Sequence, residues 1–374
     1  MPIFFLVLLL IYGGMHFHMY RKVSGAFVVP FPLKAVMLLF MGLMVFAPIL
    51  VRFAERRGHE WIALPLTYAG YLWMGFIFLF FTTSLLVDLG RVLLRCPLFT
   101  SSGFHPSDRQ TLMLSLFVSL GLTVYGFYEA LDIRTEKVVL NTEKLPGSME
   151  RLRIVQVSDV HLGLIVRDKR LRKIVRTIQE ARPDVLVSTG DLVDGQIDGM
   201  ETFAAELGKL RPLFGKYAVM GNHEYYAGIG TSLAFTRHAG FDVLRGESRA
   251  VGDALTIVGV DDPASKNEGL QNPEEKDVLS SIPRKRFVLL LKHRPSVEKV
   301  SAGLFDMQLS GHVHKGQIFP FTLFTCMAYP VITGLSFHGA SALYVSRGTG
   351  TWGPPIRFLA PPEVTVIELV RRVE

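Results

Sequence analysis

Long apolar stretches occupy the first third of the chain, and shorter alternating patterns follow them. Four stretches contain no charged residue, at residues 1–20, 35–51, 61–87 and 110–128. A helix needs roughly 20 apolar residues to cross the hydrocarbon core of a bilayer, and each stretch is close to that length. We therefore predict an integral membrane protein with a transmembrane region of about four helices over residues 1–131.

The first apolar stretch, "MPIFFLVLLLIYGG", is also compatible with a secretory signal peptide. A signal peptide carries a basic segment before its apolar core and a cleavage site of small residues after it. This stretch has neither feature, so a retained membrane helix is the favoured interpretation.

Beyond residue 131, charged residues are dense and apolar residues follow the periods of short strands and helices. "LRIVQVSD" and "DVLVSTGD" have the pattern of buried strands, and "DKRLRKIVRTIQEARP" between them has helical spacing. Alternating strands and helices followed mostly by strands predict a layered α/β domain around mixed sheets. We place this domain at residues 151–374, after a linker at residues 132–150 that holds a lead-in strand and a turn.

Polar residues with metal-binding chemistry follow five of the predicted strands. They are Asp159, His161, Asp191, Asp194, Asn222, His223, His293, His312 and His314. Each segment alone is more typical of a common turn, a loop or an ordinary core histidine than of a metal site. Open α/β sheets bind ligands at the carboxyl ends of their strands, so five such segments in one domain predict a shared site.

The donor types narrow the chemistry of this site. Imidazole, carboxylate and amide groups together suit a divalent transition metal such as Mn, Fe or Zn. The absence of thiolate ligands argues against a closed structural zinc site. The donor set is too large for one ion, but it suits two ions that share a bridging carboxylate and clamp a phosphorus centre for in-line attack.

Five motifs, D-x-H, GD-x-x-D, GNHE, a single His and GH-x-H, occur in that order over residues 157–314. With them the chain resembles the calcineurin-like metallophosphoesterase family. The resemblance implies a layered αββα sandwich and a metal-dependent hydrolase of phosphoric esters or pyrophosphates. The C-terminal "YVSRGTGTWGPPIRFLAPPEVTVIEL" and the apolar N-terminus are similar to a bacterial subgroup that includes UDP-2,3-diacylglucosamine pyrophosphatase-like enzymes of lipid A biosynthesis.

The resemblance implies two bound divalent ions and a role for each matching residue. The first ion would be held by Asp159, His161 and His314. The second ion would be held by Asn222, His293 and His312. Asp191 would bridge the two ions, and a hydroxide between them would attack phosphorus.

Two further residues would act on the substrate without binding metal. His223 would stabilise the transition state or protonate the leaving group, and Asp194 would orient its imidazole. Gly311 is expected to let the backbone turn tightly, so that His312 and His314 reach different ions.

Basic residues near the motifs are candidate contacts for a substrate phosphate. Arg347, in the glycine-rich turn "SRGTG", is the favoured one, although a surface role explains it equally well. Lys292, Arg294 and Arg357 are further candidates.

The net charge of +7 would by itself suggest a nucleic-acid partner. Residues 1–131 hold nine basic and five acidic residues, and the remainder holds 31 and 28. The α/β part is therefore nearly balanced and has no basic run, so we expect no nucleic-acid binding. Basic residues are slightly more frequent on the side that carries both termini, which favours a cytoplasmic catalytic domain at a bacterial inner membrane.

These features together predict a membrane-anchored dinuclear phosphohydrolase. The favoured substrate is lipid-linked, such as a UDP-diacylglucosamine-like glycolipid, because an anchor holds the site where lipid headgroups are concentrated. One alternative is a phosphodiesterase or phosphatase acting on soluble nucleotides or phosphoproteins. Another is a non-catalytic membrane sensor or scaffold, which a missing ligand would mark, and the sequence retains every ligand of the motif.

Overall fold

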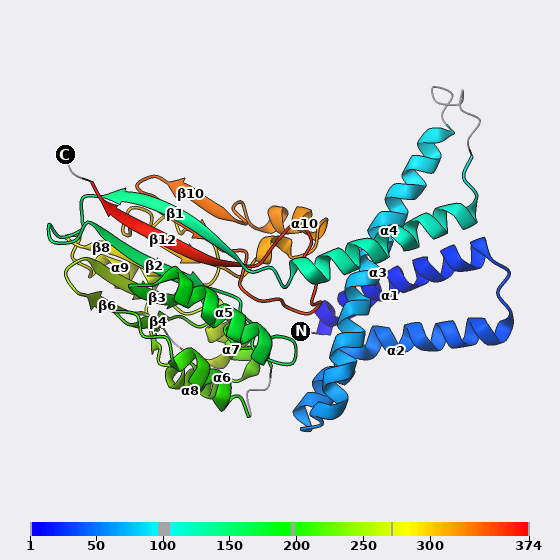
Figure 1. Ribbon diagram of the computed structural model, residues 1–374, viewed down its shortest axis with the longest axis horizontal. Coiled ribbons are helices and arrows are strands. Elements are labelled where there is room, and N and C mark those ends of the chain that lie inside the picture. The colour runs from blue at the N-terminus through cyan, green and yellow to red at the C-terminus, as the bar shows by residue number, and fades with distance from the viewer. Residues whose placement is uncertain (1, 96–104, 196–198, 271, 373–374) are drawn as a thin grey trace. The chain divides into compact units, whose positions relative to one another are not determined.

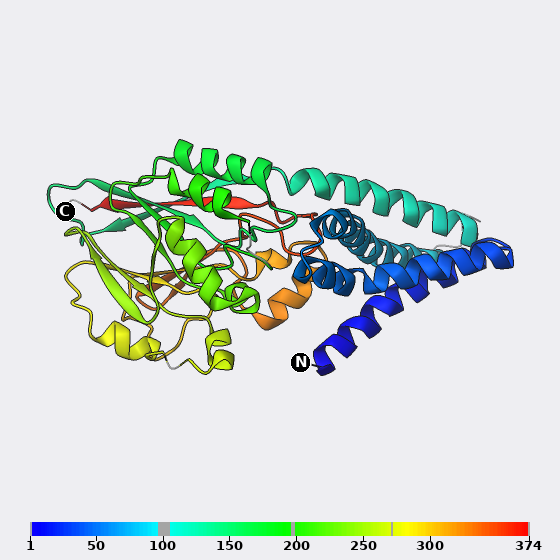
Figure 2. The ribbon, with the colours of Figure 1, turned by 90° about the horizontal axis from the view of Figure 1, so that it is seen from below.

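The computed structural model describes residues 2–95, 105–195, 199–270 and 272–372, and the chain divides into two compact units (Figures 1 and 2). The helical unit comprises Met1–Tyr128 and Gly353–Phe358. The sandwich unit comprises Glu129–Trp352 and Leu359–Glu374.

Four long helices build the helical unit, namely α1 (Pro2–Ala26), α2 (Phe31–Arg56), α3 (Glu60–Leu94) and α4 (Asp108–Glu129). The last three are long and apolar enough to cross a membrane, which confirms three of the predicted spans. Large apolar side chains such as Leu39, Leu86 and Phe117 are exposed on them, as expected of helices that face lipid. A membrane crossing by α1 stays a prediction.

Small residues bring α2 and α3 close together. A Cβ atom at Gly70 would lie 2.8 Å from the Cβ atom of Ala47, so no larger residue fits there without a shift. Ile77 and Phe80 of α3 and Leu112 of α4 are buried in the same bundle. The interior of the helical unit is therefore packed, while its surface stays apolar.

A segment from near the C-terminus completes the helical unit. Gly353–Phe358 belongs to it, and Ile356 is fully buried there. Ile356 occupies the space that Gly75 and Gly126 leave open, where an added Cβ would lie 2.5 and 2.4 Å from its side-chain carbons. The N–H of Arg357 donates to the carbonyl oxygen of Gly126 at 2.9 Å.

Two six-stranded mixed sheets form the sandwich unit (Figure 1). The first sheet consists, in order, of β1 (Arg134–Thr142), β12 (Glu363–Arg371), β2 (Arg151–Val157), β3 (Val185–Ser188), β4 (Lys216–Ala218) and β5 (Asp242–Val243). The second consists of β10 (Gly334–His338), β11 (Ser341–Val345), β9 (Met307–Ser310), β8 (Phe287–Leu291), β7 (Leu255–Gly259) and β6 (Glu247–Val251). Neighbours are parallel except for β12 with β2, β10 with β11, and β6 with β7.

Side chains of the central strands alternate between two apolar layers. In β8, Phe287, Leu289 and Leu291 enter the core that both sheets share, while Val288 and Leu290 pack in an outer cluster. The helices of this unit are α5 (Asp168–Ala181), α6 (Glu201–Gly208), α7 (Asn222–Ala227), α8 (Ile229–His238), α9 (Glu275–Ser280) and α10 (Phe321–Ala328). Helix α9 joins the outer cluster and α5 packs near β12, so the predicted α/β sandwich with mixed sheets is confirmed.

Candidate metal centre

The five polar segments meet at the carboxyl ends of strands from both sheets. The segments follow β2 (Asp159, His161), β3 (Asp191, Asp194), β4 (Asn222, His223), β8 (His293) and β9 (His312, His314). The His and Asp residues among them form three groups, and within each group the ligand atoms lie within 4.8 Å of one another. The structure therefore brings residues far apart in sequence into one cluster.

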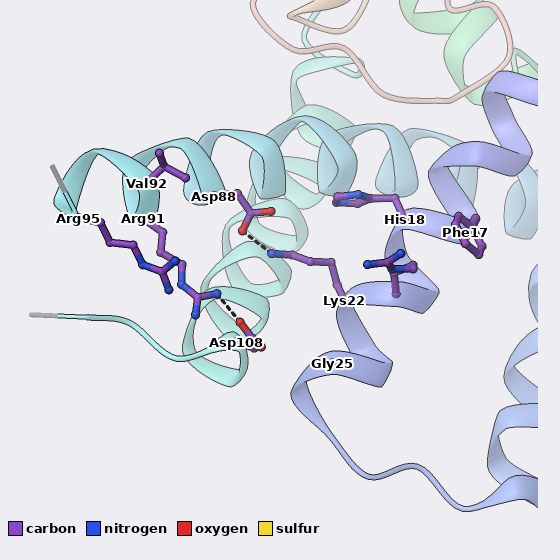
Figure 3. Close-up of a pocket in the computed structure, with 10 residues that line it drawn as sticks. Phe17, His18, Lys22, Gly25, Asp88, Arg91, Val92, Arg95 and Asp108 are labelled. Carbon is purple, nitrogen blue, oxygen red and sulfur yellow. Dashed lines mark hydrogen bonds and ion pairs between the residues drawn. The ribbon is translucent and has the colours of Figure 1, made fainter.

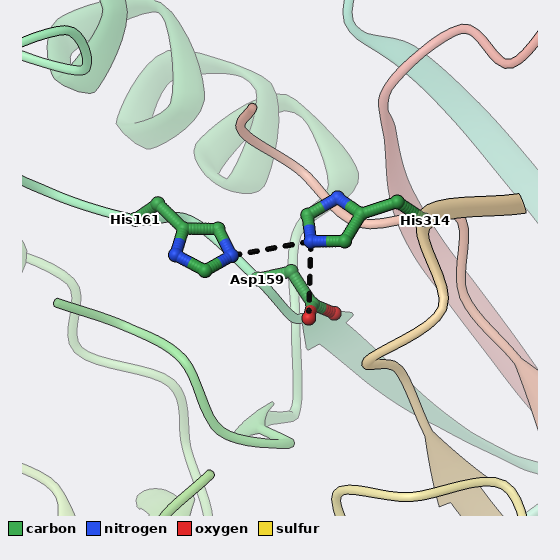
Figure 4. Close-up of side chains that lie close together, drawn as sticks. All are labelled: Asp159, His161 and His314. Atoms are coloured by element: carbon green, nitrogen blue, oxygen red, sulfur yellow. Dashed lines mark hydrogen bonds and ion pairs between the residues drawn. The ribbon is translucent and has the colours of Figure 1, made fainter. Parts of the chain in front are cut away.

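Asp159, His161 and His314 form what we call the first group (Figure 4). The Nε2 atom of His314 lies 3.1 Å from that of His161 and 3.5 Å from Oδ1 of Asp159. The Asp159 carboxylate is held in place by the His312 N–H at 3.0 Å and by the Ser158 hydroxyl at 2.5 Å. Two imidazoles and a carboxylate thus face a common point.

Asp191, His293 and His312 form the second group. The Nε2 atom of His293 lies 3.2 Å from Oδ2 of Asp191, from Oδ1 of Asn222 and from Nδ1 of His312. On its other side, Nδ1 of His293 donates to the carbonyl oxygen of Thr189 at 2.8 Å. This bond fixes the tautomer and leaves Nε2 to act as a metal ligand.

The Asp191 carboxylate lies between the two groups. Its Oδ2 atom is 3.2 Å from Nε2 of His293 in the second group and 3.9 Å from Nε2 of His161 in the first. Its Oδ1 atom accepts the backbone N–H of His223 at 2.9 Å. Asp191 is thus placed to serve both groups at once.

His223 lies beside the cluster and is paired with Asp194. The Nδ1 atom of His223 is 2.9 Å from Oδ1 of Asp194. The His223 ring makes edge contacts with the rings of His161, Tyr226 and Trp352, with centroids 4.7, 5.6 and 5.5 Å away. A hydrogen bond from Nδ1–H to the carboxylate fixes the ring and leaves Nε2 of His223 for a further partner.

The backbone is strained where the ligands are attached. The φ angles are 52° at Asp159, His161 and Asp191, 72° at His312 and 48° at His314. Each such left-handed residue costs about 1–3 kcal/mol and persists only where the surrounding fold enforces it. A strained backbone at five ligand positions indicates that the fold is organised around this cluster.

Gly311 begins the tight turn that leads to His312 and His314. Its carbonyl oxygen accepts the N–H of Val313 at 2.9 Å, and the left-handed φ angles fall at His312 and His314. A Cβ atom at Gly311 would lie 1.9 Å from the Ser158 hydroxyl and 2.1 Å from the Asp159 carboxylate. Glycine is therefore needed there for close approach rather than for a left-handed φ.

Glu224 supports the cluster from behind, a role that no pattern in the sequence predicted. Its buried carboxylate accepts four backbone N–H groups, those of Asp191, Leu192, Val193 and Gly221, at 2.6–3.2 Å. These bonds tie the loop after β3 to the start of α7. The only sequence signal was its place in the GNHE motif.

Burial and neighbouring charge shift the pKa values across the site. Burial raises the pKa of Asp159 to about 6 and lowers those of His161 and His312 to about 4 and about 3. Burial also opposes the charged form of His293, but the carboxylates of Asp191, Asp159 and Asp262 together outweigh it and raise its pKa to about 10. His223 shows the same balance, with Asp191 and Asp194 raising its pKa to about 9. Buried carboxylates here attract positive charge, as a cation site requires.

The candidate phosphate-binding residues are engaged with other partners. Arg347 forms ion pairs with Glu136 on β1 and Glu363 on β12. Lys292 pairs with Glu275 and Glu298, Arg294 pairs with Asp262, and Arg357 is fully buried. Substrate binding by Arg347 therefore stays a prediction.

Comparisons with known proteins identify the family. The profile of the calcineurin-like phosphoesterase family matches residues 152–316, the stretch that carries the cluster. A metallophosphoesterase from Aquifex aeolicus is 39% identical over 258 residues, which cover 68% of this chain and 98% of that protein. The chain belongs to the calcineurin-like phosphoesterase family. This phosphoesterase is a metal-dependent hydrolase, as the sequence predicted.

Other relatives of this phosphoesterase differ in how much of the chain they match. A transmembrane protein with a metallophosphoesterase domain from Danio rerio is 30% identical over 354 residues, covering 90% of this chain and 80% of that protein. A metallophosphoesterase from Campylobacter jejuni is 31% identical over 261 residues, covering 68% of this chain and 69% of its own length. Together with the three apolar helices, the Danio rerio relative indicates membrane association.

The cluster in this phosphoesterase fits divalent transition-metal ions. Each group offers imidazole nitrogens with a carboxylate, and thiolate is absent from both, which suits Mn, Fe or Zn. Pairs of imidazole nitrogens lie 3.1 and 3.2 Å apart in a buried setting, an arrangement that a shared cation stabilises. The first group, the second group and Asn222 are the residues that could hold such ions.

Proposed function

We propose that this phosphoesterase binds two divalent ions and hydrolyses a phosphodiester or pyrophosphate bond in a lipid-linked substrate. The observation that carries the proposal is the position of Asp191, whose Oδ2 faces a histidine of each group. A carboxylate shared between two such groups is the arrangement that two ions need for in-line attack at phosphorus. Bound divalent ions would lower the pKa of a water molecule and polarise the phosphoryl oxygens.

The residues of the chain would bind and orient these ions before the substrate arrives. Asp159, His161 and His314 would hold one ion, and Asn222, His293 and His312 the other. The Thr189 carbonyl and the His312 N–H would keep His293 and Asp159 in their ligating orientations. Such supporting bonds typically contribute 10–100-fold to metal affinity or activity.

His223 would act on the substrate itself. Asp194 favours the protonated imidazole of His223 and sets its direction. Protonated His223 would donate a hydrogen bond to a phosphoryl oxygen or deliver its Nε2 proton to the leaving group. Proton transfer by a positioned side chain contributes about 10²–10⁴-fold in rate.

An exposed apolar helix next to the ligand loop supports a lipid-linked substrate. The 3₁₀ turn η3 (His314–Gly316) leads directly toward α10, and the Thr322 hydroxyl of α10 donates to the Lys315 carbonyl at 3.0 Å. On α10 the exposed large apolar side chains are Phe321, Leu323, Phe324 and Met327, 52–84% accessible. Clustered exposed apolar side chains mark a binding surface rather than ordinary protein surface. We propose that they contact acyl chains beside the metal centre.

The same proposal includes the membrane topology. We propose that α1 is a fourth span and that the sandwich unit works on the cytoplasmic face of a bacterial inner membrane. The greater number of basic residues on the side of both termini supports this orientation. A cysteine placed in the loop at residues 27–30 should react with a membrane-impermeant thiol reagent in intact spheroplasts. Reaction only after lysis would reverse the assignment.

Metal dependence is the first test of the proposed function. The purified full chain should lose activity on bis(p-nitrophenyl) phosphate after chelation and regain it with Mn²⁺, Fe²⁺ or Zn²⁺. Elemental analysis should find two ions per chain. Full turnover by protein that contains no metal would contradict the proposal.

The substrate class needs a separate test, which compares substitutions on the apolar surface of α10 with a substitution of an exposed apolar residue elsewhere. With Mn²⁺, activity should be measured on glycolipid pyrophosphates, phospholipids, nucleotides and the small ester. Phe321→Ser with Phe324→Ser should slow hydrolysis of the lipid substrate about tenfold or more, because each lost apolar contact weakens acyl-chain binding. The small ester should be unaffected, as should both substrates in Leu213→Ser, which changes an exposed apolar residue elsewhere. Equal effects on both substrates would favour a soluble substrate.

A further inference from the structure

The helical unit contains a charged cavity that the proposed function does not use. The cavity has a volume of about 770 Å³ and lies among the ends of α1, α3 and α4 (Figure 3). Its charged lining consists of Arg21, Lys22, Arg91, Arg95, Asp88 and Asp108. All of its lining residues belong to the helical unit, and none is a candidate metal ligand.

The two carboxylates of the cavity are each paired with one of its cations. Lys22 reaches from α1 to Asp88 on α3 at 2.5 Å, and Arg91 pairs with Asp108 at the start of α4 (Figure 3). Within the described parts of the chain, Arg21 and Arg95 form no ion pair. The cavity therefore keeps a net charge of +2 at the end of a helical bundle.

The two arginines that form no ion pair among the described residues favour a phosphate as a partner. A guanidinium group forms paired hydrogen bonds to phosphate oxygens, and arginine is weakly hydrated enough to use them in a partly enclosed site. A basic pocket between the ends of membrane helices suits an anionic lipid headgroup, because its cations can form charge-assisted hydrogen bonds with the phosphate. The ion pairs with Asp88 and Asp108 hold Lys22 and Arg91 in the lining of the cavity.

The cavity also has an apolar side that a free anion would not need. Phe17 and Val92 line it and are 61% and 62% exposed. On α3 the neighbouring Leu89 and Leu93 are exposed as well, at 55% and 52%. A ligand that carries a phosphate at one end and acyl chains at the other would satisfy both surfaces.

We propose that this cavity binds the phosphate of an anionic phospholipid, at a site separate from the metal centre. The phosphate would lie against Arg21 and Arg95, and the acyl chains would run along the exposed apolar face of α3. Inorganic phosphate shares the chemistry of the headgroup but has no acyl chains, so it should bind far more weakly. The lipid would join α1, α3 and α4 at their charged ends.

Native mass spectrometry of the full chain, released from detergent micelles, tests the proposal. Dioleoyl phosphatidylglycerol should remain bound at higher occupancy than dioleoyl phosphatidylcholine, which has the same chains and no net charge. Inorganic phosphate at millimolar concentration should not displace it. Displacement by inorganic phosphate, or equal retention of the two lipids, would overturn the proposal.

Charge variants assign the binding to the cavity. Arg21→Gln with Arg95→Gln should weaken phosphatidylglycerol binding about 10–30-fold, since each basic residue near a membrane surface contributes about fivefold. Arg56→Gln with Arg57→Gln removes the same charge near the end of α2 and should change binding less than twofold. Equal losses in the two variants would mean a general charge effect and would overturn the site.

A variant that binds phosphatidylglycerol more tightly cannot be explained by misfolding. Asp88→Asn leaves Lys22 unpaired and raises the charge of the cavity by one, so phosphatidylglycerol should bind about fivefold more tightly. Hydrolysis of bis(p-nitrophenyl) phosphate should be unchanged in all three variants, because none of them touches the metal centre. Weaker binding by Asp88→Asn would contradict the proposal.

Discussion

The two ligand groups use similar residues but are supported differently. In the second group, Nδ1 of His293 is bonded to the Thr189 carbonyl, which fixes the ring before any ion binds. In the first group, Nδ1 of His161 is buried without a hydrogen-bond partner in the described part of the chain. An imidazole held by a second bond is a better preorganised ligand. We therefore expect the second group to bind its ion about 10–100-fold more tightly than the first.

The groups are also interlocked through the backbone. The Asp159 carboxylate of the first group accepts the N–H of His312, a member of the second group. Asp191 faces a histidine in each group and accepts the N–H of His223. These donors are backbone N–H groups, which side-chain substitutions leave in place. Substitutions can therefore test each group separately while the loops keep their conformation.

Asp191→Asn should have the largest effect, because it acts on both groups at once. Removing the carboxylate charge that faces both ions should release both and lower the rate by more than ~10⁴-fold, since each ion supplies several kcal/mol. Elemental analysis and the rate on bis(p-nitrophenyl) phosphate measure the two effects. Asp306→Asn, which removes a carboxylate paired with Lys144 elsewhere in the sandwich unit, should retain both ions. Two retained ions in Asp191→Asn would rule out the shared carboxylate.

His161→Ala and His293→Ala should each disrupt one group, the first and the second respectively. Each variant should lose one ion and roughly 10³–10⁴-fold in rate. In His161→Ala the remaining ion should be the tightly bound one, whereas in His293→Ala it should be the weakly bound one. Competition with a chelator of known affinity measures this difference, and identical residual affinities would contradict the proposed inequality between the groups.

His223→Ala should show that a residue outside both groups acts on chemistry alone. We expect two bound ions and a rate about 10²–10⁴-fold lower, with the larger loss on a poor leaving group that needs a proton. A series of aryl phosphodiesters of graded leaving-group pKa measures this dependence. His338→Ala on β10 is a matched surface control. Loss of an ion in His223→Ala would mean that it is a ligand.

Glu224→Gln should have the smallest effect, because Glu224 acts through the loops that carry Asp191 and Asn222. An amide cannot accept four N–H groups as a carboxylate does, so metal affinity should fall about 10–100-fold. Excess metal should restore most of the rate, which a catalytic role would not allow. Glu275→Gln, at another buried carboxylate, should lower the Tm while leaving metal affinity unchanged.

The clustering of the candidate ligands could be predicted because its signal is local. Each follows a short buried strand, and strands of this kind end at one edge of a sheet. The role of Glu224 could not be predicted, since it depends on four N–H groups from two separate loops. Nor did any pattern reveal that a side chain at position 311 would collide with Ser158 and Asp159, which follow β2 of the other sheet.

Long-range pairing was likewise beyond the sequence pattern. β12 lies between β1 and β2, parallel to one and antiparallel to the other, although it comes last in the chain. Hydrophobic alternation predicts a strand but carries no information on which distant strand becomes its neighbour. The sequence pattern likewise does not predict that Gly353–Phe358 belongs to the helical unit, because an apolar residue such as Ile356 is typical of either unit.

That segment has a consequence for the order of events during synthesis. The helices leave the ribosome first, but the space between Gly75 and Gly126 stays open until Ile356 is made, after nearly the whole sandwich unit. We expect the helical bundle to mature late, once the segment that carries Ile356 has left the ribosome. Ribosome-arrested chains ending at residue 340 should be cleaved in the helical unit by added protease faster than released full-length chains. Equal cleavage rates would show that the bundle closes without its last segment.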